Sequence, residues 1–184
     1  MRVISGKFGG RKLKPVPGNK TRPTTDKVRE ALFNMIGPYF NGGNFLDLYA
    51  GSGAVSLEAV SRGMDHAILV DKQYAAYKTI KENIAMVSDP NDFSVWKINA
   101  ESALTKLKKE GQSFDYIFLD PPYKKQQMMK QLDEIAKDHL LNNNGMVICE
   151  TDNQTNMSDD AANYRLIKQK DYGLTIISIY QIMN

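Results

Sequence analysis

The sequence predicts an α/β fold with a mostly parallel β-sheet covered by helices, and two observations support this prediction. From residue 44 to about residue 150, short apolar strands alternate with helix-length segments, as in parallel sheets with crossover helices. The strands are apolar on both sides, as a sheet buried on both faces requires. With 184 residues, 42% of them hydrophobic and 24% charged, the chain suits one domain, and a disordered or collagen-like chain is excluded.

The alternating region contains five predicted strands and four helices. The strands lie at residues 45–50, 67–70, 93–98, 116–119 and 146–150. The helices lie between them, at residues 54–62, 74–87, 101–109 and 126–141. After a polar stretch at 151–163, which suggests a loop or short helix, residues 164–171 and 174–183 flank Tyr172-Gly173 and predict a hairpin. One strand of that hairpin must run antiparallel to the rest.

The first 24 residues are rich in Gly, Pro, Lys and Arg and predict a short basic β-hairpin extension. Residues 3–5 and 11–13 are candidate strands around Gly6 and the Gly9-Gly10 turn. A helix follows, with a threonine as N-cap and Asp26 in its first turn, and it ends at residues 37–38. The single domain therefore divides into an extension at 1–24 and a core at 25–184.

The net charge of +3 conceals an uneven distribution. Residues 1–30 hold nine basic and two acidic residues, a net charge of +7, whereas residues 31–184 hold 15 basic and 19 acidic residues, a net charge of −4. A basic head on a slightly acidic body suggests contact with a polyanion, and charge alone is equally compatible with a solvated arm.

The cysteine, the histidines and the distribution of apolar residues indicate the compartment and bear on a possible metal site. Cys149 is the only cysteine and lies in an apolar run, which predicts a buried strand position and no catalytic role. His66 and His139 have no cluster of potential ligands around them, so no metal site is expected. The sequence shows no signal peptide and no run of about 20 apolar residues, so we expect a cytoplasmic protein with no membrane contact.

The first motif is a glycine turn, Asp-Leu-Tyr-Ala-Gly-Ser-Gly at residues 47–53, between the first strand and its helix. Gly51 and Gly53 permit a tight turn and close approach of a ligand. Asp71 ends the next strand, where a carboxylate can accept ribose hydroxyls. A plain strand–helix turn is the alternative, since Gly-x-Gly is common. Without the third glycine of dinucleotide-binding turns, an adenosine cofactor lacking phosphate is favoured.

The second motif, Asp120-Pro121-Pro122-Tyr123, follows the fourth strand. Two prolines remove two N–H donors, so an aspartate and a free carbonyl leave a site that only accepts hydrogen bonds. Such a site suits an amino group such as the exocyclic amine of a base, which Tyr123 could stack against. The alternative is a rigid loop with a half-buried tyrosine.

These residues resemble a known family, the class I S-adenosylmethionine-dependent methyltransferases with an Asp/Asn-Pro-Pro-aromatic signature. More closely, the chain resembles the bacterial 16S ribosomal RNA guanine-N2 methyltransferases of the RsmD type. The segments that carry this resemblance span most of the chain: Arg2–Gly6, Gly9–Arg11, Arg22–Glu30, Leu32–Asn34, Asp47–Gly53 and Asp120–Tyr123.

The resemblance implies a Rossmann-like, seven-stranded sheet with an antiparallel last strand. It implies S-adenosylmethionine as cofactor, with Asp47, Gly51 and Gly53 at its methionine end and Asp71 at its ribose. The remaining expected cofactor residues are Tyr49 (often Phe in the family), Ser52, Lys72, Asn99, Ala100, Thr24 and Thr25. The family's catalytic turn maps onto Asp120 and the Pro121 carbonyl, which would hold the target amine, and onto Tyr123, which would stack on the base.

The implied reaction is methyl transfer to the exocyclic N2 of a guanine in 16S ribosomal RNA, with Asp120 as amine holder or also as base. We expect a monomer acting on ribosomal RNA or the assembling small subunit. The cations expected to bind RNA are Arg2, Lys7, Arg11, Lys12, Lys14 and Arg22. The alternatives are an amino-methyltransferase acting on DNA adenine or protein glutamine, and a non-catalytic RNA-binding module.

Overall fold

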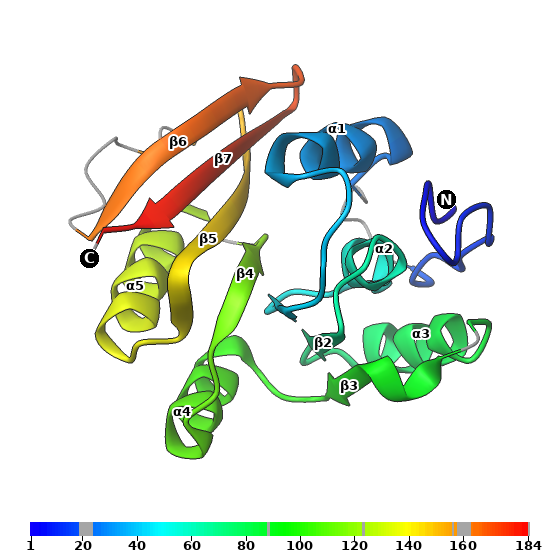
Figure 1. Ribbon diagram of the computed structural model, residues 1–184. Coiled ribbons are helices and arrows are strands. Elements are labelled where there is room, and N and C mark those ends of the chain that lie inside the picture. The colour runs from blue at the N-terminus through cyan, green and yellow to red at the C-terminus, as the bar shows by residue number, and fades with distance from the viewer. Residues whose placement is uncertain (19–23, 88, 123, 156, 158–162, 184) are drawn as a thin grey trace. The chain divides into compact units, whose positions relative to one another are not determined.

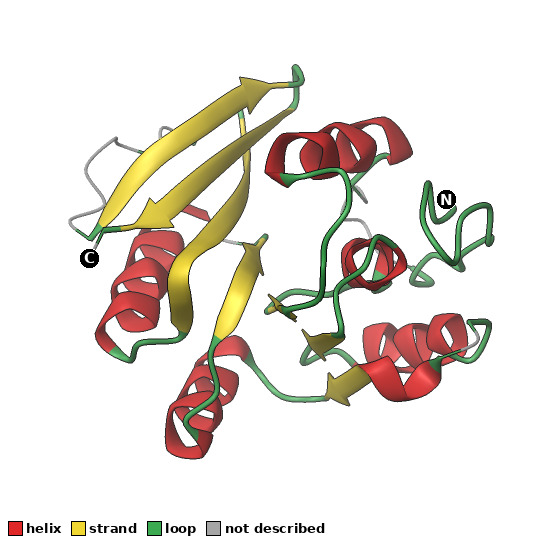
Figure 2. Ribbon diagram, viewed as in Figure 1, coloured by secondary structure: helices red, strands yellow, loops and turns green. Residues whose placement is uncertain are grey.

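The computed structural model in Figure 1 describes residues 1–18, 24–87, 89–122, 124–155, 157 and 163–183. They form two compact units, Met1–Ala100 and Glu101–Asn184. Each unit contains strands and helices that alternate along the chain, as predicted (Figure 2). Whether the two units make up a single domain stays a prediction.

The first unit is built on three parallel strands, β1 (Asn44–Asp47), β2 (His66–Val70) and β3 (Phe93–Trp96), in the order β3-β2-β1. Its helices in the described residues are α1 (Asp26–Ile36), α2 (Ala54–Ser61), α3 (Tyr74–Ile84) and the short 3-10 helix η1 (Pro90–Asp92). The strand side chains Phe45, Leu46 and Leu69 are fully buried, so the centre of this part of the sheet is apolar.

The second unit contains α4 (Ala100–Glu110) except for its first residue, α5 (Lys124–Lys137) and the strands β4 (Phe114–Leu119), β5 (Leu141–Asp152), β6 (Tyr164–Asp171) and β7 (Thr175–Ile182). The strand order is β4-β5-β7-β6. β4 and β5 are parallel, whereas β7 is antiparallel to both β5 and β6, and Figure 1 shows the β6–β7 hairpin in orange and red. The predicted seven-stranded, mostly parallel sheet with an antiparallel last strand is confirmed.

The largest error in the predicted elements lies at the end of the fourth helix, which was expected to reach residue 141. Helix α5 ends at Lys137, and His139 adopts a left-handed φ of 53° that breaks the helical path. Leu141 then pairs with Phe114 as the first residue of β5. β5 is therefore much longer than the predicted strand at 146–150. The sequence did not indicate this, because apolar residues such as Leu140 and Leu141 fit the start of a strand as well as the end of a helix.

Other boundaries differ by a few residues. β1 ends at Asp47 and β3 at Trp96, short of the predicted residues 50 and 98, because the chain turns at the carboxyl edge. Thr25 is the N-cap of α1, since its hydroxyl accepts a hydrogen bond from the Val28 amide at 3.2 Å, as predicted.

The predicted N-terminal β-hairpin is formed only in part. Within residues 1–18, the segments around Arg2 and Lys12 pair at one isolated antiparallel bridge, with backbone hydrogen bonds from Val3 N to Arg11 O at 2.9 Å and from Leu13 N to Met1 O at 3.0 Å, and no extended strand forms. The pairing does not extend past Val3, because the backbone amides at Ile4 and Ser5 donate to the Glu58 carboxylate instead of to a second strand. The segment is nevertheless packed, because the side chains of Val3, Phe8 and Leu13 are buried.

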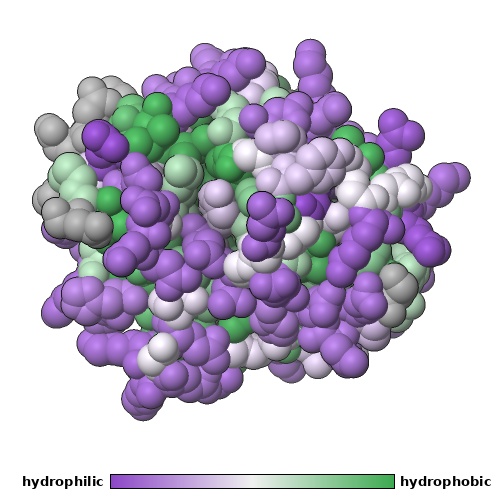
Figure 3. Space-filling model, in the orientation of Figure 1, coloured by the Kyte–Doolittle hydropathy of each residue, from purple (hydrophilic) through white to green (hydrophobic). Residues whose placement is uncertain are grey.

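The face of the molecule shown in Figure 3 is mostly hydrophilic, with smaller apolar areas between the polar side chains. Among the described residues, no helix combines the length and the apolar character needed to span a bilayer.

Candidate active site

In the first unit, three predicted site residues follow parallel strands at the same edge of the sheet. Asp47 is the last residue of β1, Asp71 directly follows β2, and Asn99 comes three residues after β3. Two backbone hydrogen bonds continue the strand pairing past the strand ends, from Ala50 N to Val70 O at 2.9 Å and from Asp71 N to Trp96 O at 3.2 Å. The carboxyl edge of a parallel sheet is where such folds bind ligands.

The glycine turn is tied to the aspartate after β2. The Gly51 amide donates to Asp71 Oδ2 at 3.0 Å, and both glycines have left-handed φ values, 55° at Gly51 and 80° at Gly53. A Cβ added at Gly51 would meet nothing within 4 Å, whereas one at Gly53 would lie 3.0 Å from Leu69 Cδ2. Gly51 therefore faces open space that a ligand can approach, and Gly53 faces the core.

The Asp71 carboxylate is half-buried and preorganised. Its second oxygen, Oδ1, accepts the Gln73 amide at 2.9 Å. Burial raises the pKa of Asp71, and the backbone hydrogen bonds from Gln73 and Gly51 and the charge of Lys72 act in the opposite direction. A carboxylate offers about four acceptor sites, so after these two bonds it retains acceptor capacity for hydroxyl groups.

Asp47 has a different environment, because its side chain is only 1% exposed. Its Oδ1 accepts the Tyr49 amide at 3.3 Å, and its Oδ2 accepts the Ser56 hydroxyl at 3.0 Å. These bonds fix the start of the turn to helix α2. The expected place of Asp47 at the methionine end of a cofactor stays a prediction.

The other expected cofactor residues vary in exposure. Ala100 is buried, whereas Tyr49, Ser52 and Thr24 are partly exposed. Lys72, Asn99 and Thr25 are exposed, and the Thr25 hydroxyl is engaged as the cap of α1.

The groups at this edge of the sheet fit an adenosyl cofactor. A half-buried carboxylate with free acceptor capacity suits a pair of ribose hydroxyls, and the glycine that faces open space allows close approach of the ligand. No group of three or more His, Cys, Asp or Glu side chains that could hold a metal is found among the described residues.

The second motif lies in the second unit, directly after β4. Asp120 is partly exposed, Pro121 is buried and Pro122 is exposed. Because neither proline has an N–H group, the described part of this turn presents a carboxylate and carbonyl groups. Tyr123 lies outside the described residues. Cys149, on the neighbouring strand, is buried as predicted, and burial raises the pKa of its thiol.

The sequence did not single out a buried asparagine that supports the glycine turn. Asn83 on α3 is fully buried. Its Nδ2 donates to Ser52 O at 2.9 Å and to Lys14 O at 3.0 Å, and its Oδ1 accepts the Lys14 amide at 2.8 Å. An amide on the apolar face of a predicted helix, between Ile80 and Ile84, was the signal that could have revealed it.

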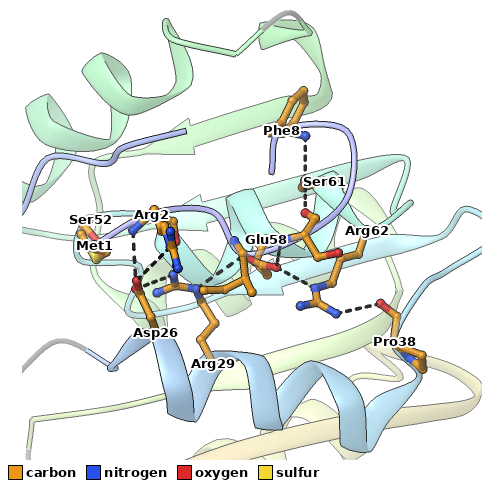
Figure 4. A network of polar contacts seen from close by, with 12 residues as sticks. Met1, Arg2, Phe8, Asp26, Arg29, Pro38, Ser52, Glu58, Ser61 and Arg62 are labelled. Carbon is orange, nitrogen blue, oxygen red and sulfur yellow. Dashed lines mark hydrogen bonds and ion pairs between the residues drawn. The ribbon is translucent and has the colours of Figure 1, made fainter. Parts of the chain in front are cut away.

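A second group of buried polar residues holds the N-terminal segment on helix α2 (Figure 4). Glu58 is fully buried; besides accepting the Ile4 and Ser5 amides, it forms ion pairs with Arg62 at 2.7 Å and Arg29 at 3.6 Å. The Ser61 hydroxyl accepts the Phe8 amide at 2.9 Å. The segment therefore forms part of the first unit.

In the folded protein, carboxylates from other parts of the chain pair with cations of that segment. Lys7 forms ion pairs with Asp92 at 2.9 Å and Asp89 at 3.4 Å. Burial lowers the pKa of Lys7, but hydrogen bonds to these carboxylates outweigh that effect and raise it.

Arg2 and Lys14 are also paired, with Asp26 at 3.9 Å and Glu82 at 2.9 Å. Arg11 and Lys12 are exposed, and the described part of the chain shows no ion pair for either. Arg22 lies outside the described residues.

Comparison with known proteins places the chain in a family. The family model described as "Conserved hypothetical protein 95" matches residues 1–181. The chain is 44% identical to the protein YlbH of Bacillus subtilis, over 98% of both chains. It is 31% identical to "Ribosomal RNA small subunit methyltransferase D" of Escherichia coli, over 98% of this chain and 89% of that protein.

Among solved structures, yhhF of Escherichia coli matches with a TM-score of 0.84 and 30% identity, covering 99% of this chain and 97% of the other. The agreement extends over nearly the whole chain in both sequence and fold. This chain therefore belongs to the family of ribosomal RNA small subunit methyltransferase D.

Proposed function

We propose that this protein transfers a methyl group from S-adenosylmethionine to the exocyclic N2 amine of a guanine in 16S ribosomal RNA. Membership in the family supports the reaction class and the ribosomal RNA substrate. The observation that carries the chemistry is the turn after β4, which offers acceptors and no N–H donor at Pro121 and Pro122. An amino group with two hydrogens complements such a turn.

In this proposal Asp120 and the Pro121 carbonyl accept hydrogen bonds from the amine of the base. When bound, the cofactor supplies an electrophilic methyl group on its sulfonium. The two acceptors orient the nitrogen lone pair and stabilise the positive charge that develops on the nitrogen, which is catalysis by positioning and electrostatics. Tyr123 stacks on the base once it has left its helical stack.

The first unit supplies cofactor binding in the same proposal. Asp71 binds the ribose hydroxyls and Gly51 allows the ligand to approach the turn. Asp47, Tyr49, Ser52 and Gly53 line the methionine end. The remaining contacts are assigned to residues at the strand and helix ends, namely Thr24, Thr25, Lys72, Asn99 and Ala100.

We assign contact with the RNA backbone mainly to Arg11 and Lys12. They are exposed, and no ion pair occupies them in the described part of the chain. Arg2, Lys7 and Lys14 contribute less in this assignment, because each has a carboxylate partner that competes with phosphate. The protein acts as a monomer in the cytoplasm, where its ribosomal RNA substrate is made, and needs no metal.

The decisive experiment compares 16S ribosomal RNA from cells with and without the gene. Mass spectrometry of nuclease fragments should show one N2-methylguanosine that disappears with the gene and returns on adding purified protein and S-adenosylmethionine. Asp120→Ala should fail to restore it, whereas Asp133→Ala, which alters an exposed aspartate on α5, should restore it. A protein that binds RNA but transfers no methyl group would instead be a non-catalytic module. Methyl transfer to adenine or glutamine would contradict the proposed substrate and leave the reaction type in place.

A further inference from the structure

We infer that Asn83 is a positioning residue that couples RNA binding by the N-terminal segment to cofactor binding at the glycine turn. This inference rests on the proposed function, since it links the two ligands that the function requires. It concerns the first unit alone, where Asn83, Lys14 and Ser52 are all described.

The first step is that one side chain holds both segments. Asn83 Nδ2 has two hydrogens, and each has its own acceptor: Ser52 O in the glycine turn at 2.9 Å and Lys14 O in the N-terminal segment at 3.0 Å. Its Oδ1 accepts the Lys14 amide at 2.8 Å. The N-terminal segment and the glycine turn are therefore both bonded to the fully buried amide of Asn83. A shift of Lys14 must either move Ser52 or break a hydrogen bond of that amide.

The second step is that the two ends of this link are close to the two binding regions. Ser52 lies between Gly51, whose amide donates a hydrogen bond to Asp71, and Gly53, the N-cap residue of α2. Lys14 lies two residues after Lys12 in the basic segment, and its ammonium group pairs with Glu82 at 2.9 Å, next to Asn83 on the same helix. A second contact joins the same parts, because the Ser52 hydroxyl lies 3.6 Å from Met1 Sδ.

The third step is thermodynamic. RNA that engages Arg11 and Lys12 favours one position of this segment, and through Asn83 it favours one position of the Ser52 carbonyl in the turn. Cofactor binds the turn in that same position, so each ligand favours the state that the other one binds. Coupling of this kind is reciprocal: the factor by which RNA tightens cofactor binding must equal the factor by which cofactor tightens RNA binding.

The experiment measures that factor in both directions. Dissociation constants for S-adenosylhomocysteine are determined by calorimetry with and without saturating unmethylated 16S ribosomal RNA transcript, and those for the transcript with and without saturating S-adenosylhomocysteine. In the wild type we expect a tightening of about fivefold to tenfold in each direction, in the usual range of coupling between sites. Asn83→Ala should bring the factor close to one, even where its affinity for either ligand alone has also fallen.

Asn91→Ala is the matched control, because it removes an exposed amide from the same unit and should retain the wild-type factor. Hydrogen exchange gives a second measurement: RNA should slow exchange of the Gly51 and Gly53 amides in the wild type and not in Asn83→Ala. If Asn83→Ala does not fold, the wild-type measurements still decide, since a factor of one in both directions overturns the inference.

An Asn83→Ala protein that keeps the full coupling factor also overturns it. Neither result touches the proposed function, which is tested separately by methylation of the RNA. A wild type that binds neither ligand and transfers no methyl group would overturn the proposed function itself.

Discussion

The glycine turn after β1 and the Asp-Pro-Pro turn after β4 occupy equivalent places, each following a parallel strand, but their backbones are opposite in character. Gly51 keeps its N–H and uses it to hold the Asp71 carboxylate. Pro121 and Pro122 have no N–H to use. The first turn thus fixes an acceptor through a backbone donor, whereas the second has acceptor groups and no N–H donor at its prolines.

The two turns also differ in how they are stiffened. Left-handed φ values at Gly51 and Gly53 allow a tight turn, and the buried side chains of Asp47 and Asn83 then hold it by hydrogen bonds. In the other turn the proline rings themselves restrict φ. This difference predicts that substitutions in the glycine turn affect cofactor affinity and stability, whereas those in the Asp-Pro-Pro turn affect the rate of transfer.

The largest expected effect is on catalysis by Asp120→Ala. Loss of one preorganised acceptor should lower kcat by about 100- to 1,000-fold, with the affinity for S-adenosylmethionine nearly unchanged. Single-turnover methylation of 16S ribosomal RNA and calorimetry measure the two quantities. Equal losses in kcat and cofactor affinity would mean that the two turns do not divide their tasks as proposed.

Asp71→Ala should show the opposite division. Removing a charged acceptor of the ribose hydroxyls should weaken cofactor binding by about 10- to 100-fold, since a hydrogen bond to a charged group contributes about 1.5–3 kcal/mol. The rate at saturating cofactor should change much less. The control Asp133→Ala, on the surface of α5, should match the wild type in both measurements.

The same aspartate gives a pH dependence with a definite sign. Burial raises the pKa of Asp71, so the carboxylate becomes protonated at a higher pH than an ordinary aspartate, whose pKa is about 3.9. On acidification, affinity for S-adenosylhomocysteine should therefore fall before ordinary aspartates titrate. Asp71→Asn should remove that fall, and a loss of affinity that persists in this variant would assign it to another group.

Within the glycine turn, Gly53→Ala should be more damaging than Gly51→Ala. A left-handed alanine costs about 1–2 kcal/mol at either position, but at Gly53 the new Cβ would also press on Leu69 Cδ2 at 3.0 Å. Thermal unfolding should show the larger drop in Tm for Gly53→Ala. Gly51→Ala should instead weaken cofactor binding more, because its Cβ would occupy the open space beside the turn.

The sequence was sufficient to predict the strand–helix alternation and the places of both turns, because these depend on local patterns. Hydrophobic periodicity locates the strands, and glycine and proline mark the turns. The end of α5 was not predictable in this way. Leu140 and Leu141 continue an apolar pattern, and only the left-handed backbone at His139 shows that the helix has already stopped.

The supporting residues were harder to predict because they act across long sequence distances. Asn83 bonds to residues 31 and 69 positions away, and Glu58 binds amides more than 50 positions away. Ile80 and Ile84 place Asn83 on an apolar helix face, but nothing local shows which groups Asn83 or Glu58 would bond. The +7 charge of residues 1–30 was likewise visible in the sequence, while its partial neutralisation by Asp89, Asp92 and Glu82 required the fold.

The smallest expected effect tests whether proline stiffness or acceptor chemistry matters more in the second turn. Pro122→Ala leaves Asp120 and the Pro121 carbonyl in place, introduces one N–H group at residue 122 and increases the freedom of the unfolded chain, a cost of about 0.4–1 kcal/mol. We expect a small drop in Tm, comparable to that of the control Pro90→Ala at the start of η1, and a change in kcat of about twofold or less. A fall in kcat as large as that of Asp120→Ala would show that the rigid geometry of the turn or the missing N–H at residue 122, and not only the two acceptors, sets the rate of transfer.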